Sequence, residues 1–287
     1  MVRTWTRADA ARALRRPTAD DDKYSRGVLG MRTGSDAYPG AAVLGVEAAW
    51  RTGLGMVRYL GPERPADLVL ARRPETVTAD GRVQAWVIGS GTDASARTPS
   101  DTAALRALLS DTDPVVVDAG ALDLAAEATA PRILTPHDRE HARLRAALGL
   151  GHTPADRVAA ARETAEATGA VVLLKGGVTV VVAPDGWVAT VESGTPWLAT
   201  AGTGDVLAGV IGALVAGAMA QEGRADAANL ASLAASGAWL HGRAGAIAAQ
   251  SASIARAPSS PPFGDGPITA LDVADALPRA VAEALSR

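Results

Sequence analysis

The stretch Thr200-Ala201-Gly202-Thr203-Gly204-Asp205 decides the architecture expected of this chain, because it joins two glycines and an acid to the long apolar segment 206–220. Glycine permits backbone conformations that other residues avoid and lets the main chain approach a ligand closely. A helix that begins near Gly202 leaves its first N–H groups unpaired, and such groups bind anions. The stretch therefore indicates either an anion site with a carboxylate beside it or a simple N-cap formed by Thr203 or Asp205.

The composition excludes several classes of function. The formal net charge is -3 and aromatic residues make up 3%, which argues against a nucleic-acid partner. The chain has no cysteine, so disulfides, thiolate zinc sites and cysteine nucleophiles are excluded, and a cytoplasmic location is expected. The apolar segment 206–220 is shorter than the roughly 20 residues that span a bilayer, and residues 1–16 lack an apolar signal-peptide core. We therefore expect no membrane association.

Short apolar runs alternate with helical patterns along most of the 287 residues. The patterns predict strands at 28–31, 56–60, 68–71, 86–88, 114–118, 132–135 and 171–175, and a hairpin of 178–183 with 187–191. They predict helices at 9–16, 41–52, 101–110 (capped by Ser100 or Asp101), 121–128, 137–148, 154–168, 225–249 and 269–286. The expected fold class is α/β, with a mainly parallel sheet covered by helices on both faces and an antiparallel edge hairpin. We expect a single domain over 1–287, with a core at about 23–249 and a flexible loop at 251–267.

Four of the predicted strands end in residues suited to ligand binding. These ends are Gly89-Ser90-Gly91, Asp118, Thr135-Pro136-His137 and Lys175-Gly176-Gly177. Because ligands of open α/β sheets bind at the carboxyl ends of the strands, the four ends should open onto one rim. The carboxylate of Asp205 is expected to join them there.

Four motifs in a fixed order carry a resemblance to a known family. They are Gly34-Ser35-x-x-Tyr38-Pro39-Gly40-Ala41-Ala42, Thr135-Pro136-His137-x-x-Glu140, Lys175-Gly176-Gly177-Val178-Thr179 and the stretch from Ala199 to Gly209 that contains Asp205. Together they resemble the ADP-dependent NAD(P)H-hydrate dehydratases, and the similarity runs from about Lys23 to Ala249. The resemblance implies the ribokinase-like fold, a three-layer sandwich.

The resemblance also implies an activity. Members of the family repair NADHX and NADPHX, the hydrated forms of the reduced nicotinamide cofactors. ADP, or ATP in eukaryotic relatives, phosphorylates the added hydroxyl, and loss of phosphate restores the cofactor and leaves AMP. A homotetramer is expected on the same grounds, and Mg²⁺ is expected because phosphoryl transfer generally uses it. Too few residues precede Lys23 for the epimerase domain of many bacterial members, so a dehydratase alone is expected.

Family roles transfer onto particular residues of this chain. Asp205 is the expected catalytic base, because a carboxylate at an anion-binding helix start can accept a hydroxyl proton during phosphoryl transfer. The expected anion hole is Gly202, Thr203 and Gly204; the nucleotide site is Lys175, Gly176, Gly177, Val178, Thr179 and Gly204; the hydrated-cofactor site is Ala41, Gly89, Gly91, His137 and Asp205. A tight turn with a solvated lysine is the alternative for Lys175. Gly89-Ser90-Gly91 departs from the usual G-P-G-L-G of the family.

Other charged residues remain open to two interpretations. His137-x-x-Glu140-His141 also fits a zinc-peptidase pattern, but His137 lies at a helix entry and no third ligand is evident, so no protein metal site is predicted and His141 is expected at the surface. Asp118 and Glu140 are either structural or close to magnesium. The charged segment Lys23, Arg26 and Gly27 either approaches phosphates or is a solvated loop.

Two rival functions remain. A vitamin kinase of the same superfamily, acting on a hydroxymethylpyrimidine or a thiazole alcohol, would use the same anion hole and base. Such kinases typically carry T-P-N-x-x-E where this chain has Thr135-Pro136-His137-x-x-Glu140, so His137 favours the dehydratase. A non-catalytic nucleotide-binding regulator is the third possibility, and the intact Asp205 argues against it.

Overall fold

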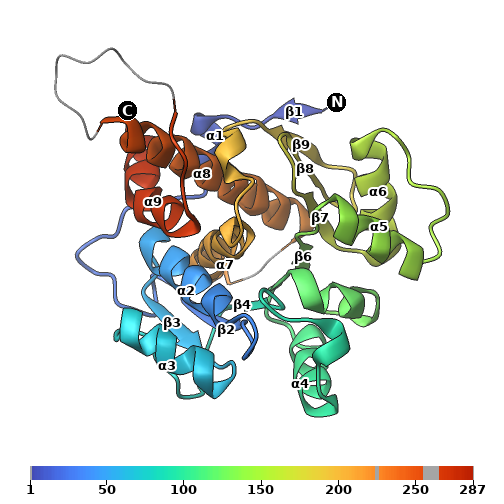
Figure 1. Cartoon of the computed structure of the whole chain (residues 1–287), viewed down its shortest axis with the longest axis horizontal. Coiled ribbons are helices and arrows are strands. Elements are labelled where there is room, and N and C mark those ends of the chain that lie inside the picture. The colour runs from blue at the N-terminus through green and yellow to red at the C-terminus, as the bar shows by residue number, and fades with distance from the viewer. Residues whose placement is uncertain (1, 224–225, 255–264, 287) are drawn as a thin grey trace.

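A single mixed sheet forms the centre of the computed structural model, which describes residues 2–223, 226–254 and 265–286 (Figure 1). Its strand order is β1-β9-β8-β7-β6-β5-β4-β2-β3. The strands are β1 (Arg3–Thr4), β2 (Val28–Arg32), β3 (Met56–Tyr59), β4 (Ala85–Ile88), β5 (Val115–Val117), β6 (Arg132–Leu134), β7 (Val171–Leu174), β8 (Thr179–Val182) and β9 (Val188–Val191). Only the β7–β8 and β8–β9 pairs are antiparallel among the described strands, and the β8–β9 pair is the predicted hairpin.

Helices cover both faces of this sheet (Figure 1). They are α1 (Arg7–Arg12), α2 (Pro39–Thr52), α3 (Glu63–Arg72), α4 (Pro99–Leu109), α5 (Asp138–Ala147), α6 (Arg157–Thr168), α7 (Thr203–Glu222), α8 (Ala227–Ile254) and α9 (Ala270–Leu285), with 3₁₀ segments η1 (Ala94–Ala96), η2 (Ala119–Glu127) and η3 (Pro196–Leu198). Alternate strand residues enter two separate hydrophobic clusters. Val116 belongs to the cluster that also holds residues of α2, α7, α8 and α9, whereas its neighbours Val115 and Val117 belong to the cluster that holds residues of α4, η2 and α6. The period-2 geometry of a strand therefore builds one core on each face.

Helix α7 lies in the middle of one helical layer. It is long and apolar enough to cross a bilayer, but 67% of its most apolar window is buried inside the protein, as expected of a core helix. Glycines allow it to approach α2 closely, since a Cβ placed on Gly209 would lie 2.2 Å from the carbonyl oxygen of Gly45. This packing fixes the position of the first turn of α7, which carries the predicted anion site.

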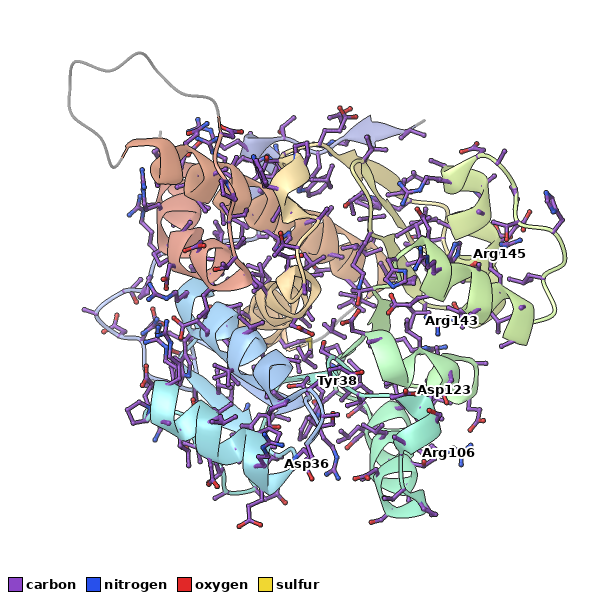
Figure 2. All side chains as sticks on the ribbon, in the orientation of Figure 1. Asp36, Tyr38, Arg106, Asp123, Arg143 and Arg145 are labelled. Carbon is purple, nitrogen blue, oxygen red and sulfur yellow. The ribbon has the colours of Figure 1, made fainter. Side chains whose placement is uncertain are left out.

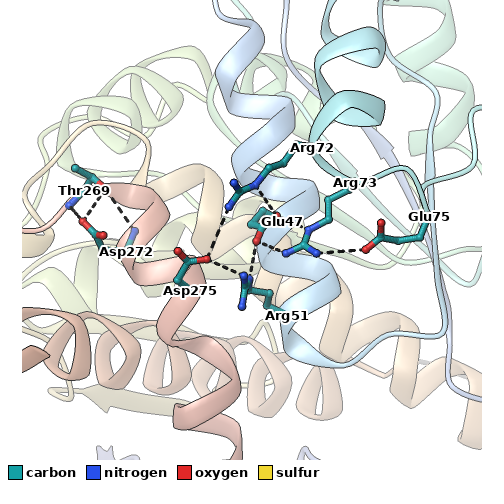
Figure 3. A network of polar contacts seen from close by, with 8 residues as sticks. All are labelled: Glu47, Arg51, Arg72, Arg73, Glu75, Thr269, Asp272 and Asp275. Carbon is teal, nitrogen blue, oxygen red and sulfur yellow. Dashed lines mark hydrogen bonds and ion pairs between the residues drawn. The ribbon is translucent and has the colours of Figure 1, made fainter.

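A buried acid joins the helices that flank α2 (Figure 3). Glu47 on α2 is fully buried and accepts hydrogen bonds from Arg51 at 2.6 Å, from Arg72 at 3.3 Å and from Arg73 at 2.5 Å. Asp275 on α9 pairs with Arg51 at 2.9 Å. Burial acts to raise the pKa of Glu47, but the guanidinium groups of Arg73 and Arg51 outweigh it and hold that pKa at about 2. Glu47 therefore ties α2 to α3, and Asp275 extends the network to α9.

Several predicted elements differ in the structure. The strand predicted at 68–71 is wrong, because these residues lie in α3, which buries Val69 and leaves Leu68 exposed. The helix predicted at 121–128 is the 3₁₀ segment η2, the helix at 9–16 ends at Arg12, and Thr98 rather than Ser100 or Asp101 caps α4. Of the loop predicted at 251–267, residues 251–254 belong to α8, and residues 255–264 lie outside the described residues.

Candidate active site

The carboxyl ends of four neighbouring strands converge on the buried carboxylate of Asp118. It accepts hydrogen bonds from the hydroxyl of Ser90 at 2.9 Å, the hydroxyl of Thr135 at 2.8 Å and the ammonium group of Lys175 at 2.9 Å. These donors follow β4, β6 and β7, and Asp118 itself follows β5. Because three donors occupy its oxygens, Asp118 positions Lys175 rather than acting as a free metal ligand.

The backbone next to Asp118 is strained. Ala119 has a φ of 44°, and it is the one non-glycine residue with positive φ in the described part of the chain. Gly89 has a φ of 91°, and a Cβ there would lie 2.1 Å from the carbonyl oxygen of Asp118. Strain of this kind persists only where the surroundings fix it, and it concentrates at functional sites.

Lys175 connects Asp118 to the first turn of α7. Its Nζ lies 3.6 Å from Oε2 of Glu140, and a Cβ built on Gly204 would lie 3.5 Å from the same Nζ. Burial acts to lower the pKa of Lys175, but the carboxylates of Asp118 and Glu140 outweigh it and raise the pKa above its usual value. The ammonium group is therefore a fixed positive charge at the anion-binding end of the helix.

The start of α7 has the form expected of an anion site and not of a side-chain cap. Gly202 is the N-cap with a φ of 89°, and no side chain caps the helix there, so the simpler N-cap prediction is wrong. Burial raises the pKa of Asp205 to about 7, Asp118 adds to the rise, and Lys175 opposes it. A carboxyl group that titrates near neutrality is suited to accept a proton from a substrate hydroxyl.

Arg157, at the start of α6, shapes the loop that follows β7. Its guanidinium donates to the carbonyl oxygens of Lys175 at 2.8 Å and Val178 at 2.5 Å, and it pairs with Asp138 at 3.1 Å. These bonds turn the loop carbonyls toward α6. Gly177 faces open space, because a Cβ there would meet nothing within 4 Å. The loop therefore has one pinned side and one side open to a ligand.

The opposite side of the rim is formed by the residues predicted to hold the hydrated cofactor. Gly91 has a φ of 66°, and a Cβ there would lie 2.2 Å from Cβ of Ala41. Ser35 fixes this contact by donating to the carbonyl oxygen of Gly91 at 2.9 Å. Tyr38, at the start of α2, is 60% exposed and lies between α2 and α4 in the view of Figure 2. The structure thus brings Ala41 and Gly91 together next to an exposed aromatic ring.

His137 is the N-cap of α5 and does not form a zinc pair. Its Nδ1 accepts from the backbone N–H of Arg139 at 3.1 Å, and Glu140 accepts from the backbone N–H of His137 at 2.8 Å. The prediction that His141 is a surface residue is wrong: it is 3% exposed, and its Nε2 lies 2.8 Å from the hydroxyl of Thr164. Burial lowers the pKa of His141 to about 4, and Arg145 adds to the effect. No group of three or more possible metal ligands occurs in the described residues.

The charged segment near residue 26 lies away from this rim. A Cβ on Gly27 would contact the backbone of Ala216, in the second half of α7, and Arg26 donates to the carbonyl oxygen of Gly53 at 2.9 Å. This placement favours the alternative of a loop away from the site, and contact of Lys23, Arg26 and Gly27 with phosphates of the cofactor stays a prediction. Arg157 could not be identified from the sequence, because a single arginine at a helix start matches no motif.

Comparisons with known proteins identify the relatives of this chain. A family model described as NAD(P)H-hydrate dehydratase (Carb_kinase) matches residues 29–260. The bifunctional NAD(P)H-hydrate repair enzyme Nnr of Mycobacterium leprae is 47% identical over 222 residues, which cover 73% of this chain and 45% of that protein. The ADP-dependent (S)-NAD(P)H-hydrate dehydratase of Neisseria meningitidis serogroup B is 37% identical over 256 residues, 82% of each chain. This chain spans about half the length of the bifunctional relatives.

Solved structures show the same fold. The ADP/ATP-dependent NAD(P)H-hydrate dehydratase of Bacillus subtilis, co-crystallised with ATP/Mg²⁺, has a TM-score of 0.77, 28% identity and 99% coverage of both chains. A ribokinase-like superfamily protein of Enterococcus faecalis also has a TM-score of 0.77, at 21% identity, with 99% coverage of this chain and 96% of that one, which is a likeness of fold alone. The predicted ribokinase-like α/β class is confirmed. Since the family model matches most of its length, the chain belongs to the NAD(P)H-hydrate dehydratase family.

Proposed function

We propose that this chain catalyses the ADP-dependent dehydration of (6S)-NADHX and (6S)-NADPHX to NADH and NADPH, giving AMP and phosphate. One observation carries the proposal: Asp205, a carboxyl group with a pKa of about 7, lies at a helix start that no side chain caps, next to the charged Lys175. The names of the Neisseria meningitidis and Bacillus subtilis relatives support the choice of substrate and of ADP or ATP.

Binding of both ligands follows from the two sides of the rim. The loop Lys175-Gly176-Gly177-Val178-Thr179 presents its open side to the phosphates of the nucleotide, and Arg157 holds the other side. The backbone N–H groups at Gly202, Thr203 and Gly204 receive the phosphoryl group in transfer, since the helix N-terminus favours negative charge. Gly89, Gly91, Ala41 and His137 hold the hydrated cofactor, so that its hydroxyl faces Asp205.

Chemistry then proceeds in two steps. Asp205 accepts the proton of the substrate hydroxyl while the hydroxyl oxygen forms a bond to the terminal phosphorus of ADP and the bond from that phosphorus to AMP breaks. Loss of the phosphate from the phosphorylated ring, with loss of a ring proton, restores the double bond of the dihydronicotinamide. The charge of Lys175 stabilises the transferred phosphoryl group throughout.

Mg²⁺ fits this site as a companion of the nucleotide. Glu140 is the carboxylate available to hold it, because the oxygens of Asp118 are taken by three donors. Mg²⁺ commonly takes one or two protein carboxylates and completes its shell with phosphate oxygens and water. When bound, it would neutralise charge on the phosphates.

The proposal is tested by incubating the purified chain with NADHX and ADP and following the absorbance of NADH. NADH should form, and equal amounts of AMP and phosphate should appear. Absence of NADH with both ADP and ATP would contradict the proposal. Phosphorylation of hydroxymethylpyrimidine or a thiazole alcohol without NADH formation would identify a vitamin kinase instead, and nucleotide binding without any turnover would identify a regulator.

Assembly and location belong to the same proposal. We expect a homotetramer in the cytoplasm with no membrane or nucleic-acid partner, in keeping with the core position of α7 and the net charge of -3. Sedimentation of the purified protein tests the tetramer directly.

A further inference from the structure

A cavity lies at the far end of α7 from Asp205. Its volume is about 630 Å³, and its wall includes the α7 residues Ala213, Gly217 and Gln221. Gly217 is twelve residues beyond Asp205, which places the cavity about 18 Å along the helix axis from the predicted catalytic carboxylate. Cavities of several hundred Å³ are the usual size of small-molecule sites, whereas well-packed protein interiors leave few such voids.

The inner wall of this cavity is aromatic and firmly held. The rings of Trp5 and Trp187 lie edge to face, with centroids 5.4 Å apart. The indole N–H of Trp5 donates to Ser236 of α8 at 3.1 Å, so the ring is fixed in orientation. Leu214 and Leu233 add apolar surface. Such a wall suits a flat apolar or aromatic body.

The rim of the cavity carries an excess of positive charge. Four arginines and one carboxylate line it. Arg3 and Arg12 share Asp9, and Arg15 pairs with Asp21. Asp9 on the rim and Asp21 outside the lining thus pair with three of the four guanidinium groups.

Arg26 is the arginine of this rim that has no carboxylate partner among the described residues. It donates to the carbonyl oxygen of Gly53 at 2.9 Å, its Nε has no hydrogen-bond partner, and no carboxylate of the described residues pairs with it. The bond to Gly53 offsets the negative end of α2, and Arg26 is one of the residues that line the cavity. A cationic rim above an aromatic wall matches a ligand with a ring and an anionic group.

We propose that this cavity binds a small aromatic anion, a ring that bears a phosphate, carboxylate or sulfonate group. The ring packs against Trp5 and Trp187, and the anionic group lies between Arg26 and Arg12. The site is separate from the rim at Asp205, so it holds its ligand whether or not the proposed dehydratase activity is present.

Two matched dyes test the proposal on the intact chain. The probe is 8-anilinonaphthalene-1-sulfonate, and the comparison is its uncharged analogue N-phenyl-1-naphthylamine, each titrated by fluorescence. The sulfonate should bind about tenfold or more tightly than the neutral dye, as one charge-assisted contact predicts. Arg26→Met should abolish that preference and leave the affinity of the neutral dye nearly unchanged. Equal affinity of the two dyes for the wild-type chain would overturn the proposal.

Two further variants locate the binding. Ala218→Trp places a ring into the cavity from α7 and should abolish binding of both dyes. Arg64→Met is the matched control, because Arg64 also donates to one backbone carbonyl, that of Asp36 at 2.7 Å, but lies outside the cavity. Sulfonate binding that survives in both Arg26→Met and Ala218→Trp would overturn the proposal.

Competition identifies the class of natural ligand. Displacement of the sulfonate by AMP indicates a phosphate-bearing ring, and displacement by indole-3-acetate indicates a carboxylate-bearing one. If neither compound displaces the dye, the cavity binds only the dye, and the proposal is overturned. Asp205→Asn should give the same titrations as the wild-type chain, so the result is independent of the proposed dehydratase activity.

Discussion

Replacing Asp118 with asparagine should change the pH dependence of the reaction more than it changes the fold. The substitution keeps the size of the side chain and its place between Ser90 and Thr135, but it removes the negative charge 2.9 Å from Lys175. That charge is the second cause, after burial, of the raised pKa of Asp205, which is about 7. When this negative charge is removed, its repulsion of the ionised form of Asp205 is lost while the attraction of Lys175 remains. The pKa of Asp205 therefore falls.

The size of this change follows from Coulomb's law. Two unit charges about 6 Å apart at an effective dielectric constant of about 20 interact by about 3 kcal/mol, which equals about two pKa units as an upper bound. We therefore expect the acid limb of kcat/KM to move down by about one to two pH units in Asp118→Asn. The rate itself should fall as well, because Lys175 loses its principal partner.

The assay measures NADH formation from NADHX and ADP between about pH 5 and about pH 9. Ser90→Ala is the matched control, since it removes one hydrogen bond of 2.9 Å to Asp118 and keeps the charge. Its acid limb should stay near that of the wild-type chain. An acid limb that does not move in Asp118→Asn would refute the reasoning, because Asp205 would then not be the group that titrates.

Three other perturbations give independent checks. Arg157→Ala should raise the KM for ADP about tenfold and change kcat by less than about threefold, because the loop carbonyls of Lys175 and Val178 lose their donor; added guanidinium should restore part of the affinity, and an unchanged KM would show that Arg157 is not needed. Glu47→Gln should lower the free energy of unfolding by about 3 kcal/mol at neutral pH, because three arginines lose a buried counter-charge. The folded-state pKa of Glu47, about 2, lies below its usual 4.5, so this contribution is present above pH 4.5 and is lost as the pH falls toward 2; denaturant titrations that differ equally at both ends of that range would contradict it. Asp205→Asn should stabilise the fold by about 2 kcal/mol above pH 7, after allowance for solvent screening. The folded-state pKa of Asp205, about 7, lies above its usual 3.8, so the wild-type chain loses stability as the pH rises from 3.8 to 7; a thermal midpoint of the variant that does not rise above pH 7 would count against the raised pKa.

The parallel sheet and its rim could be predicted because the signals are local. A strand such as Val115–Val117 is apolar at every position. This pattern is expected of a sheet that helices cover on both faces. The rule that ligands lie at the carboxyl ends of strands then placed Asp118 and Lys175 on one edge, and the structure joins them by an ion pair of 2.9 Å.

The remaining features depend on contacts that a single segment does not reveal. Residues 68–71 form an apolar run short enough for either a strand or a helix, and packing against α2 makes them helical. Arg157 reaches the loop at Val178 only after α6 and β7 have packed together. His141 has polar neighbours in sequence, and it is Thr164 of α6 that gives it a buried partner. The cavity beside Trp5 joins residues as far apart in the sequence as Arg3 and Ser236.

One measurement tests the proposed chemistry most directly: NADH formation from NADHX and ADP by the wild-type chain and by Asp205→Asn, at equal protein concentration and with circular dichroism to confirm the fold. The wild-type chain should regenerate NADH, and the variant should lose at least about a hundredfold in kcat with its fold intact, as expected on removal of a general base. NADH formation by Asp205→Asn at close to the wild-type rate would contradict the assignment of Asp205 as the base.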